Sequence, residues 1–342
     1  MADLSKYTKE LTYLFTSSEN ILLISHINPD GDAVGSQLAL YHFLNSRGKK
    51  VNMLIPNYLQ EFLKWMDGAD LIDVYIKDRK KCRQLIKQAD LIVMLDFNHA
   101  NRLGEAEPYV KSSGARKVLI DHHLDPEHFS DITIADDMKC STSELIHDII
   151  TDINGGEKFR NRSYSEALYV GIITDTGNFE HGNYSPQTFR TVAELLESGL
   201  DHSKILDLIY NNFTPERMRL QGFALENRMV VLPEYKSAYI YLSREDLSRF
   251  SHAKGDTEGF VNLPLSIRGI NFSTLFIEKE GFIKLSFRSK GNFPSNEFAS
   301  LYFYGGGHLN ASGGEYPDTL ENTIGYFLKV LKENYWRFGD GK

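Results

Sequence analysis

Residues 21–26, ILLISH, form a short apolar run that stops at an imidazole, and three further runs end in the same way. They are LIVMLD (Leu91 to Asp96), KVLIDHH (Lys117 to His123) and LYVGIITD (Leu168 to Asp175). Short runs rich in Ile, Val and Leu, separated by helical patterns, indicate buried parallel strands. Ligands of open α/β sheets bind at the carboxyl ends of the strands. We therefore expect four strands to bring acids and imidazoles to one sheet edge, as a metal site requires.

Composition is that of a soluble globular protein of two domains, with 342 residues, 42% apolar and 25% charged. No run is long enough to cross a membrane, and the N-terminal MADLSKYTKELTYLF lacks the features of a signal peptide. Cys82 and Cys140 are far apart and form no CxxC motif, which favours a reducing, cytoplasmic location. The net charge of −8 argues against long nucleic acid as a partner.

Two α/β domains are predicted. A parallel-sheet domain covers residues 1–205, a helical linker covers 206–229, and a smaller domain covers 230–342. The linker is expected because residues 201–230 are helical in pattern. Beyond Val230 the hydrophobic pattern changes to the alternation typical of strands. A glycine cluster and a C-terminal helix over about 318–336 follow.

Other local signals come from the first domain. The pattern predicts an amphipathic helix near residues 4–17. A capping box at Ser141 and Glu144 predicts a helix that runs to about Asp152. Residues 164–175 are expected to pass from helix into the fourth buried strand.

The loop after the first run, HINPDGD, offers His26, Asp30 and Asp32 as metal ligands. Pro29 and Gly31 force a turn, so the two aspartates can point to different places. A mixture of imidazole and carboxylate suits Mn²⁺, Co²⁺, Fe²⁺ or Zn²⁺ better than Ca²⁺. The alternative is that Asp30 or Asp32 only caps a helix.

The other strand ends supply the remaining candidates. Asp96 is the best residue to bridge two metal ions, although an isolated Asp at this place is often only a turn former. In Asp121-His122-His123 the side chains alternate if the strand stays extended. We therefore assign His122 to a metal, His123 to a substrate oxygen, and Asp121 to orienting an imidazole.

Asp175 ends the fourth run, where an Asx-turn is the alternative interpretation. The predicted metal ligands are thus enough for two ions with Asp96 shared, and they are His26, Asp30, Asp32, Asp96, His122 and Asp175. Two ions about 3.5–4 Å apart stabilise both the attacking and the leaving oxygen of a phosphoryl displacement. They also lower the pKa of water, so that hydroxide can attack phosphorus near neutral pH.

A second candidate region follows strand FIKLSF in the C-terminal domain. Gly305, Gly306 and Gly307 lead into His308, and such a run lets backbone amides approach an anion. The run lacks the Lys-Ser/Thr of a P-loop, and a plain flexible loop is the alternative. Arg288, followed by Ser289, is expected to offer a fork-shaped phosphate contact, unless it is only a solvated charge.

Together these residues resemble the DHH phosphoesterase family over nearly the whole chain. HINPDGDAVGS resembles its first motif, Asp96 its second, Asp121-His122-His123 the motif that names it, and Asp175 its fourth. FRS and GGGHLNASGG resemble the domain associated with the RecJ-type exonucleases and nano-RNA hydrolases. One departure is Phe97-Asn98-His99 after Asp96, where small hydroxyl residues are more usual.

The resemblance implies roles for individual residues. One ion would take His26, Asp30 and Asp96, and the other Asp32, Asp96, His122 and Asp175. Both would usually be Mn²⁺. His123 would contact the scissile phosphate or assist the leaving oxygen. The positions that match substrate contacts in the family are Arg102, Arg288 and His308.

Size narrows the expected function. A compact member with two domains and no membrane segment resembles the subfamily of oligoribonucleases that also hydrolyse 3′-phosphoadenosine-5′-phosphate (pAp). We expect hydrolysis of very short RNA to mononucleotides and of pAp to AMP, and a possible homodimer. The rivals are a phosphohydrolase for linear or cyclic dinucleotides, pyrophosphate or polyphosphate, and a non-catalytic nucleotide-binding or RNA-binding protein.

Overall fold

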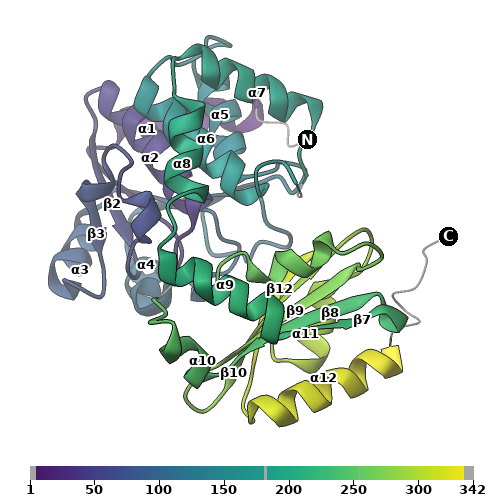
Figure 1. Ribbon diagram of the computed structural model, residues 1–342. Coiled ribbons are helices and arrows are strands. Elements are labelled where there is room, and N and C mark those ends of the chain that lie inside the picture. Colours follow the sequence, from purple (N-terminus) through teal and green to yellow (C-terminus); the bar gives the residue numbers. More distant parts are fainter. Residues whose placement is uncertain (1–4, 181–182, 254, 335–342) are drawn as a thin grey trace. The chain divides into compact units, whose positions relative to one another are not determined.

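The computed structural model describes residues 5–180, 183–253 and 255–334, and these divide into two compact units (Figure 1). Unit 1 covers residues 1–212 and unit 2 covers 213–342. The division falls between helices α8 (His202–Tyr210) and α9 (Pro215–Asn227). Each unit contains a six-stranded sheet with helices, which confirms the predicted α/β class. No helix in the described ranges combines the length and the apolar composition needed to cross a bilayer.

The sheet of unit 1 is parallel throughout, in the order β3-β2-β1-β4-β5-β6. Its strands are β1 (Asn20–Ile24), β2 (Lys50–Ile55), β3 (Ile72–Val74), β4 (Leu91–Leu95), β5 (Arg116–Asp121) and β6 (Ile132–Ala135). β4 is buried along its whole length, which is why its sequence is continuously apolar. The order of the strands reverses between β1 and β4, and the crevice at such a switch point is the usual ligand site.

Helices cover both faces of this sheet (Figure 1). Ile21 and Leu23 of β1 face one core, and Leu22 and Ile24 face the other, as period-2 alternation requires. The second core receives α3 (Arg79–Gln88) and α4 (Glu107–Ser112). The first receives α1 (Ser5–Ser17), α2 (Gly31–Ser46), α5 (Thr142–Ile153), α6 (Arg162–Asp175), α7 (Pro186–Glu197) and α8.

The prediction of a fourth buried strand, Leu168 to Asp175, is wrong, because these residues form the last turns of α6. α6 packs against α2 and α5, so its apolar residues surround the helix and show no one-sided stripe. A short apolar run of this kind cannot be told from a buried strand by periodicity. Close packing also needs small residues, since a Cβ on Gly35 of α2 would lie 2.5 Å from the carbonyl oxygen of Ala167.

Unit 2 contains a mixed sheet in the order β11-β12-β10-β9-β8-β7. β8 and β9 pair in parallel, and the other neighbours are antiparallel. The strands are β7 (Met229–Leu232), β8 (Ser237–Leu242), β9 (Phe272–Glu278), β10 (Ile283–Ser289), β11 (Gly306–His308) and β12 (Ala311–Tyr316).

The helices of unit 2 close two separate cores. A phenylalanine-rich core contains side chains of α11 (Ser295–Tyr302) and α12 (Leu320–Asn334). The other core contains side chains of α9, α10 (Arg244–Arg249) and the 3₁₀ helix η5 (Phe260–Ser266). The last two residues of the predicted C-terminal helix, 335 and 336, lie outside the described ranges.

Candidate metal centre

Six of the predicted residues, here called the Asp–His cluster, lie together at the carboxyl edge of the first sheet. His26 follows β1, Asp96 follows β4 and His122 follows β5, and these three strands are neighbours. The other members come from helix ends, because Asp30 and Asp32 lie at the start of α2 and Asp175 ends α6.

Among the described residues, three groups of side chains could hold an ion, and one of them joins His123 to Asp96 and His122. The other two lie wholly within the cluster. In the group of His26, Asp30 and Asp96, ligand atoms lie within 4.8 Å of one another, and the same holds for Asp32, His122 and Asp175. Asp96 faces both imidazoles. Its Oδ2 is 3.4 Å from Nε2 of His26, and its Oδ1 is 3.7 Å from Nε2 of His122. This is the arrangement that a bridging carboxylate needs.

Backbone carbonyls orient the two imidazoles. Nδ1 of His26 lies 2.7 Å from the carbonyl oxygen of Ile27, and Nδ1 of His122 lies 3.3 Å from that of Lys139. Nε2 of each ring faces a carboxylate of the cluster, and an imidazole protonated on Nδ1 offers the lone pair of Nε2 to a metal. Nε2 of His122 is 3.3 Å from Asp175 Oδ2.

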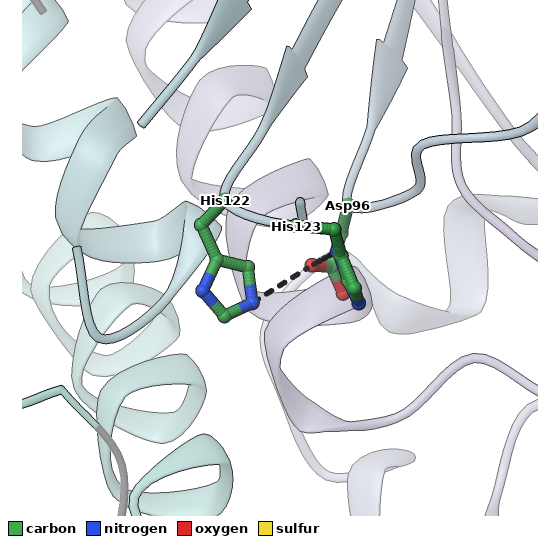
Figure 2. A group of neighbouring side chains, drawn as sticks. All are labelled: Asp96, His122 and His123. Atoms are coloured by element: carbon green, nitrogen blue, oxygen red, sulfur yellow. Dashed lines mark ion pairs between the residues drawn. The ribbon is translucent and has the colours of Figure 1, made fainter. Parts of the chain in front are cut away.

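His123 lies beside His122 at the end of β5, and Figure 2 shows both rings with Asp96 at the end of the neighbouring strand. Nδ1 of His123 is 2.6 Å from Oδ1 of Asp121, which is fully buried. Although burial opposes it, this hydrogen bond lowers the pKa of Asp121. Asp121 therefore acts as an ionised acceptor that fixes the orientation of the His123 ring.

Asp30 and Asp32 also cap helices, so the alternative interpretation describes part of what they do. Oδ1 of Asp30 accepts hydrogen bonds from the amides of Asp32 and Ala33, both at 3.1 Å. Asp32 is buried and accepts from the amides of Thr142 and Ser143, at 2.6 and 2.8 Å. These bonds hold each carboxylate in place without removing it from the cluster.

Asp96 has a left-handed backbone, with φ at 67°. A non-glycine residue there costs free energy, and such residues concentrate at functional sites. Two contacts hold it, since its amide donates to the carbonyl of Ile120 (3.1 Å) and Thr142 Oγ1 donates to its Oδ1 (2.9 Å).

The cluster is short of positive charge. Among the described residues, no Lys or Arg forms an ion pair with Asp30, Asp32, Asp96 or Asp175. Burial raises the pKa of Asp96 well above its ordinary value, and the charges of Asp32 and Asp30 add to the shift. The same causes raise the pKa of Asp175. Burial also lowers the pKa of His26, which favours the neutral, ligating form. The donor set and its repulsion fit bound divalent cations.

Arg102 is the predicted substrate contact in unit 1. Its Nη2 lies 3.0 Å from Nδ1 of His26, and its buried Nε has no hydrogen-bond partner among the described residues. A guanidinium with an unused donor beside the cluster is suited to an anionic oxygen.

The predicted contacts in unit 2 differ from one another. Arg288 has no ion pair among the described residues, and Nη1 donates to the carbonyl of Phe287 at 2.9 Å. Burial lowers its pKa. Ser289 is instead occupied, because its hydroxyl donates to the carbonyl of Phe293 and accepts from Asn310 Nδ2, both at 2.8 Å. This favours a structural role for Ser289 and leaves Arg288 open to an anion.

The glycine cluster forms the antiparallel hairpin β11–β12, here called the glycine hairpin, where a flexible loop was the alternative. A Cβ on Gly305 would lie 2.0 Å from the carbonyl oxygen of Gly313, and one on Gly307 would lie 2.6 Å from that of Ala311. A Cβ on Gly306 meets nothing within 4 Å. The fold therefore needs two of the three glycines. His308 lies in β11, and its side chain is outside the described part.

The start of α5 contributes groups that the sequence interpretation did not assign to the site. The amides of Thr142 and Ser143 hold Asp32, and the Thr142 hydroxyl holds Asp96. The capping box at Ser141 predicted the helix correctly, and Ser141 accepts from the Glu144 amide at 3.0 Å. A helix start has free amides that bind carboxylates, so this signal could have linked α5 to the site.

Comparison with known proteins agrees with this geometry. The model of the DHH family, N-terminal domain, matches residues 20–172. The bifunctional oligoribonuclease and PAP phosphatase NrnA of Bacillus subtilis is 26% identical, over 89% of this chain and 91% of that protein.

Two solved structures extend the comparison. An exopolyphosphatase-related protein from Bacteroides fragilis is 40% identical, with a TM-score of 0.94 and 98% of each chain covered. RecJ from Thermus thermophilus, solved in complex with Mn²⁺, shares the fold at 13% identity, with a TM-score of 0.55 over 99% of this chain and 55% of RecJ. The motifs, the cluster that they form and the relative at 40% identity agree, and the chain belongs to the DHH family.

Proposed function

We propose that this protein is a metal-dependent phosphoesterase that hydrolyses very short oligoribonucleotides to mononucleotides and pAp to AMP. The observation that carries the proposal is the Asp–His cluster, whose carboxylates face imidazoles and have no Lys or Arg ion pair among the described residues. In a purely structural cluster, Lys or Arg side chains would neutralise the carboxylates. In a metal site the carboxylates keep their charge for the cation.

The residues divide into two sets. His26, Asp30 and Asp96 would hold one divalent ion, and Asp32, Asp96, His122 and Asp175 the other. When bound, such ions neutralise phosphate charge and make water more acidic. His123, oriented by Asp121, would in its imidazolium form donate a hydrogen bond or a proton to a substrate oxygen through Nε2.

Mn²⁺ is the proposed metal. Mixed imidazole and carboxylate ligands suit it, and carboxylate-rich sites favour harder ions than thiolate sites do. The RecJ structure with the same fold was solved with Mn²⁺.

The nucleotide substrate is supported by the relatives of similar length. The Bacillus subtilis relative is named for oligoribonuclease and PAP phosphatase activity, and so is one from Thermus thermophilus at 27% identity. In unit 2, Arg288 and the open backbone at Gly306 would bind a phosphate of the substrate. The net charge of −8 favours short substrates over long nucleic acid.

A second candidate is hydrolysis of polyphosphate or pyrophosphate. The relative from Bacteroides fragilis, at 40% identity, is described as exopolyphosphatase-related. The metal chemistry would be the same, and the two candidates differ only in whether the substrate contains a nucleoside.

The test is a turnover panel with added Mn²⁺. The substrates are the dinucleotide pApA, pAp, pyrophosphate, polyphosphate and long single-stranded DNA, each with and without EDTA. We expect EDTA-sensitive release of AMP from pApA and pAp, and little attack on the other three.

Two outcomes would contradict the proposal. Fast hydrolysis of pyrophosphate or polyphosphate without attack on pApA would favour the second candidate. Binding of nucleotides without turnover of any substrate would indicate a non-catalytic protein. Asp175→Asn serves as the matched negative control, because it keeps the size of the side chain and removes its charge.

A further inference from the structure

Three aromatic rings, here called the aromatic cluster, follow the cluster residue Asp175 closely in the chain. They belong to Phe179, Tyr184 and Phe189. The ring centroids of Phe179 and Phe189 are 5.0 Å apart, and those of Tyr184 and Phe189 are 5.8 Å apart. Tyr184 is 41% exposed and Phe189 is 48% exposed, while Phe179 packs partly on the core. Two rings of this cluster therefore present aromatic surface to solvent.

A tight turn fixes the first ring next to Asp175. Gly177, Asn178 and Phe179 all have positive φ, at 54°, 58° and 66°. The amide of Asn178 donates to the carbonyl of Ile173 (2.7 Å), and that of Phe179 donates to Thr176 Oγ1 (3.1 Å). Left-handed backbone at an aromatic residue is unfavourable and persists only where the surroundings hold it. The turn thus reverses the chain directly after Asp175.

Hydrogen bonds fix the chain next to the other two rings. Thr188, next to Phe189, donates to Glu144 Oε1 at 3.0 Å, and Glu144 lies in the first turn of the helix whose amides hold Asp32. Asn183, next to Tyr184, donates to the carbonyl of Asp137 at 2.8 Å.

Asp137 is two residues before Lys139, whose carbonyl contacts His122. The residues next to Tyr184 and Phe189 therefore bond to segments that also contain contacts of the Asp–His cluster.

We propose that a nucleobase of the substrate stacks on Tyr184 and Phe189. This inference rests on the proposed function, and it adds the part of the substrate that the Asp–His cluster cannot recognise. Carboxylates and their bound ions recognise phosphate, and they do not stack on the flat aromatic face of a base. Exposed aromatic rings provide one, because every base has a π-face.

The chemistry of stacking also predicts the kind of selectivity. Base–aromatic stacking tolerates any sequence, so the aromatic cluster distinguishes nucleotides from pyrophosphate or polyphosphate without choosing among bases. Loss of one stacking ring weakens binding by about tenfold, which is toward the lower end of the range for a single base.

The test compares pApA with an analogue in which ribose carries no base at either position. Tyr184→Leu and Phe189→Leu keep an apolar side chain, and Tyr184→Phe keeps the ring. We measure kcat and KM with Mn²⁺, and Kd by calorimetry in the metal-free protein. Tyr13→Leu is the control, since Tyr13 is an aromatic residue of α1 that is 68% exposed.

We expect each Leu variant to lower the preference for pApA over the analogue about tenfold, through KM and Kd. Tyr184→Phe and the control should keep that preference. An unchanged preference in the double Leu variant would overturn the inference while leaving the proposed function intact. If the natural protein hydrolyses no nucleotide, the proposed function fails, and an equal Kd for pApA and the analogue would then overturn the stacking site as well.

Discussion

The Asp–His cluster of unit 1 and the glycine hairpin of unit 2 differ in whether the fold itself needs their conspicuous residues. In the cluster, like charges are held close together at a free-energy cost that the fold itself does not relieve. In the hairpin, packing explains most of the conspicuous residues. Gly305, for example, approaches Gly313 too closely to carry a side chain.

The difference shows how to recognise a functional residue. An arrangement that opposes stability indicates function, as the crowded carboxylates do. An arrangement that serves packing needs no ligand to explain it. Among the predicted contacts of unit 2 whose side chains are described, Arg288 and Gly306 are left without such a reason.

The largest expected effect belongs to Asp96→Asn. The raised pKa means that deprotonation costs the folded state free energy, so stability falls as the pH rises from the ordinary value near 4 toward neutrality. Asn removes this cost and can still accept from Thr142 Oγ1. We expect the melting temperature of the metal-free variant to rise by roughly 2–4 °C for each kcal/mol relieved, at pH 7. Turnover of pApA should fall on the order of 10³-fold.

Asp73→Asn is the control for this prediction. Asp73 lies in β3 of the same unit and pairs with Lys81 at 2.6 Å, so its removal should change the melting temperature little or lower it. A metal-free Asp96→Asn protein less stable than the natural one would show that the carboxylates do not repel one another as described.

A smaller effect is expected for Arg288→Ala in unit 2. Because the guanidinium forms no ion pair among the described residues, its loss should leave stability nearly unchanged and raise KM for pApA about 10- to 100-fold. Arg288→Lys should recover part of the loss, since Lys lacks the planar fork. The exposed Lys284 of the same strand is the control, and equal effects of Lys284→Ala and Arg288→Ala would remove the specific role of Arg288.

Most of the first unit could be predicted, because parallel strands leave distinct apolar runs and bring their carboxyl ends to one edge. His26, Asp96 and His122 were placed by this argument alone. Asp175 was assigned to the site for a wrong local reason, since it ends a helix and not a strand. It reaches the cluster because Gly31 and Gly35 let α2 pack closely on α6.

The remaining features depend on contacts between distant parts of the chain. Asp32 accepts hydrogen bonds from the amides of Thr142 and Ser143, which are more than 100 residues away in the sequence. Hydrophobic periodicity does not predict such distant pairs. The glycine run was predicted to approach an anion, with a flexible loop as the alternative, and the hairpin was not expected because glycine weakens strands; here the missing side chains allow the hairpin to pack. The aromatic cluster was missed for a similar reason, as its rings meet only through the turn after Asp175.

We infer that the Asp–His cluster holds two divalent ions. The most direct measurement is anomalous diffraction from crystals soaked in Mn²⁺, with the metal content of the dialysed protein measured in parallel. We expect two peaks per chain, one among His26, Asp30 and Asp96 and one beside His122 and Asp175, and loss of the second in Asp175→Asn. The absence of both peaks, or peaks only at other residues, would contradict this inference.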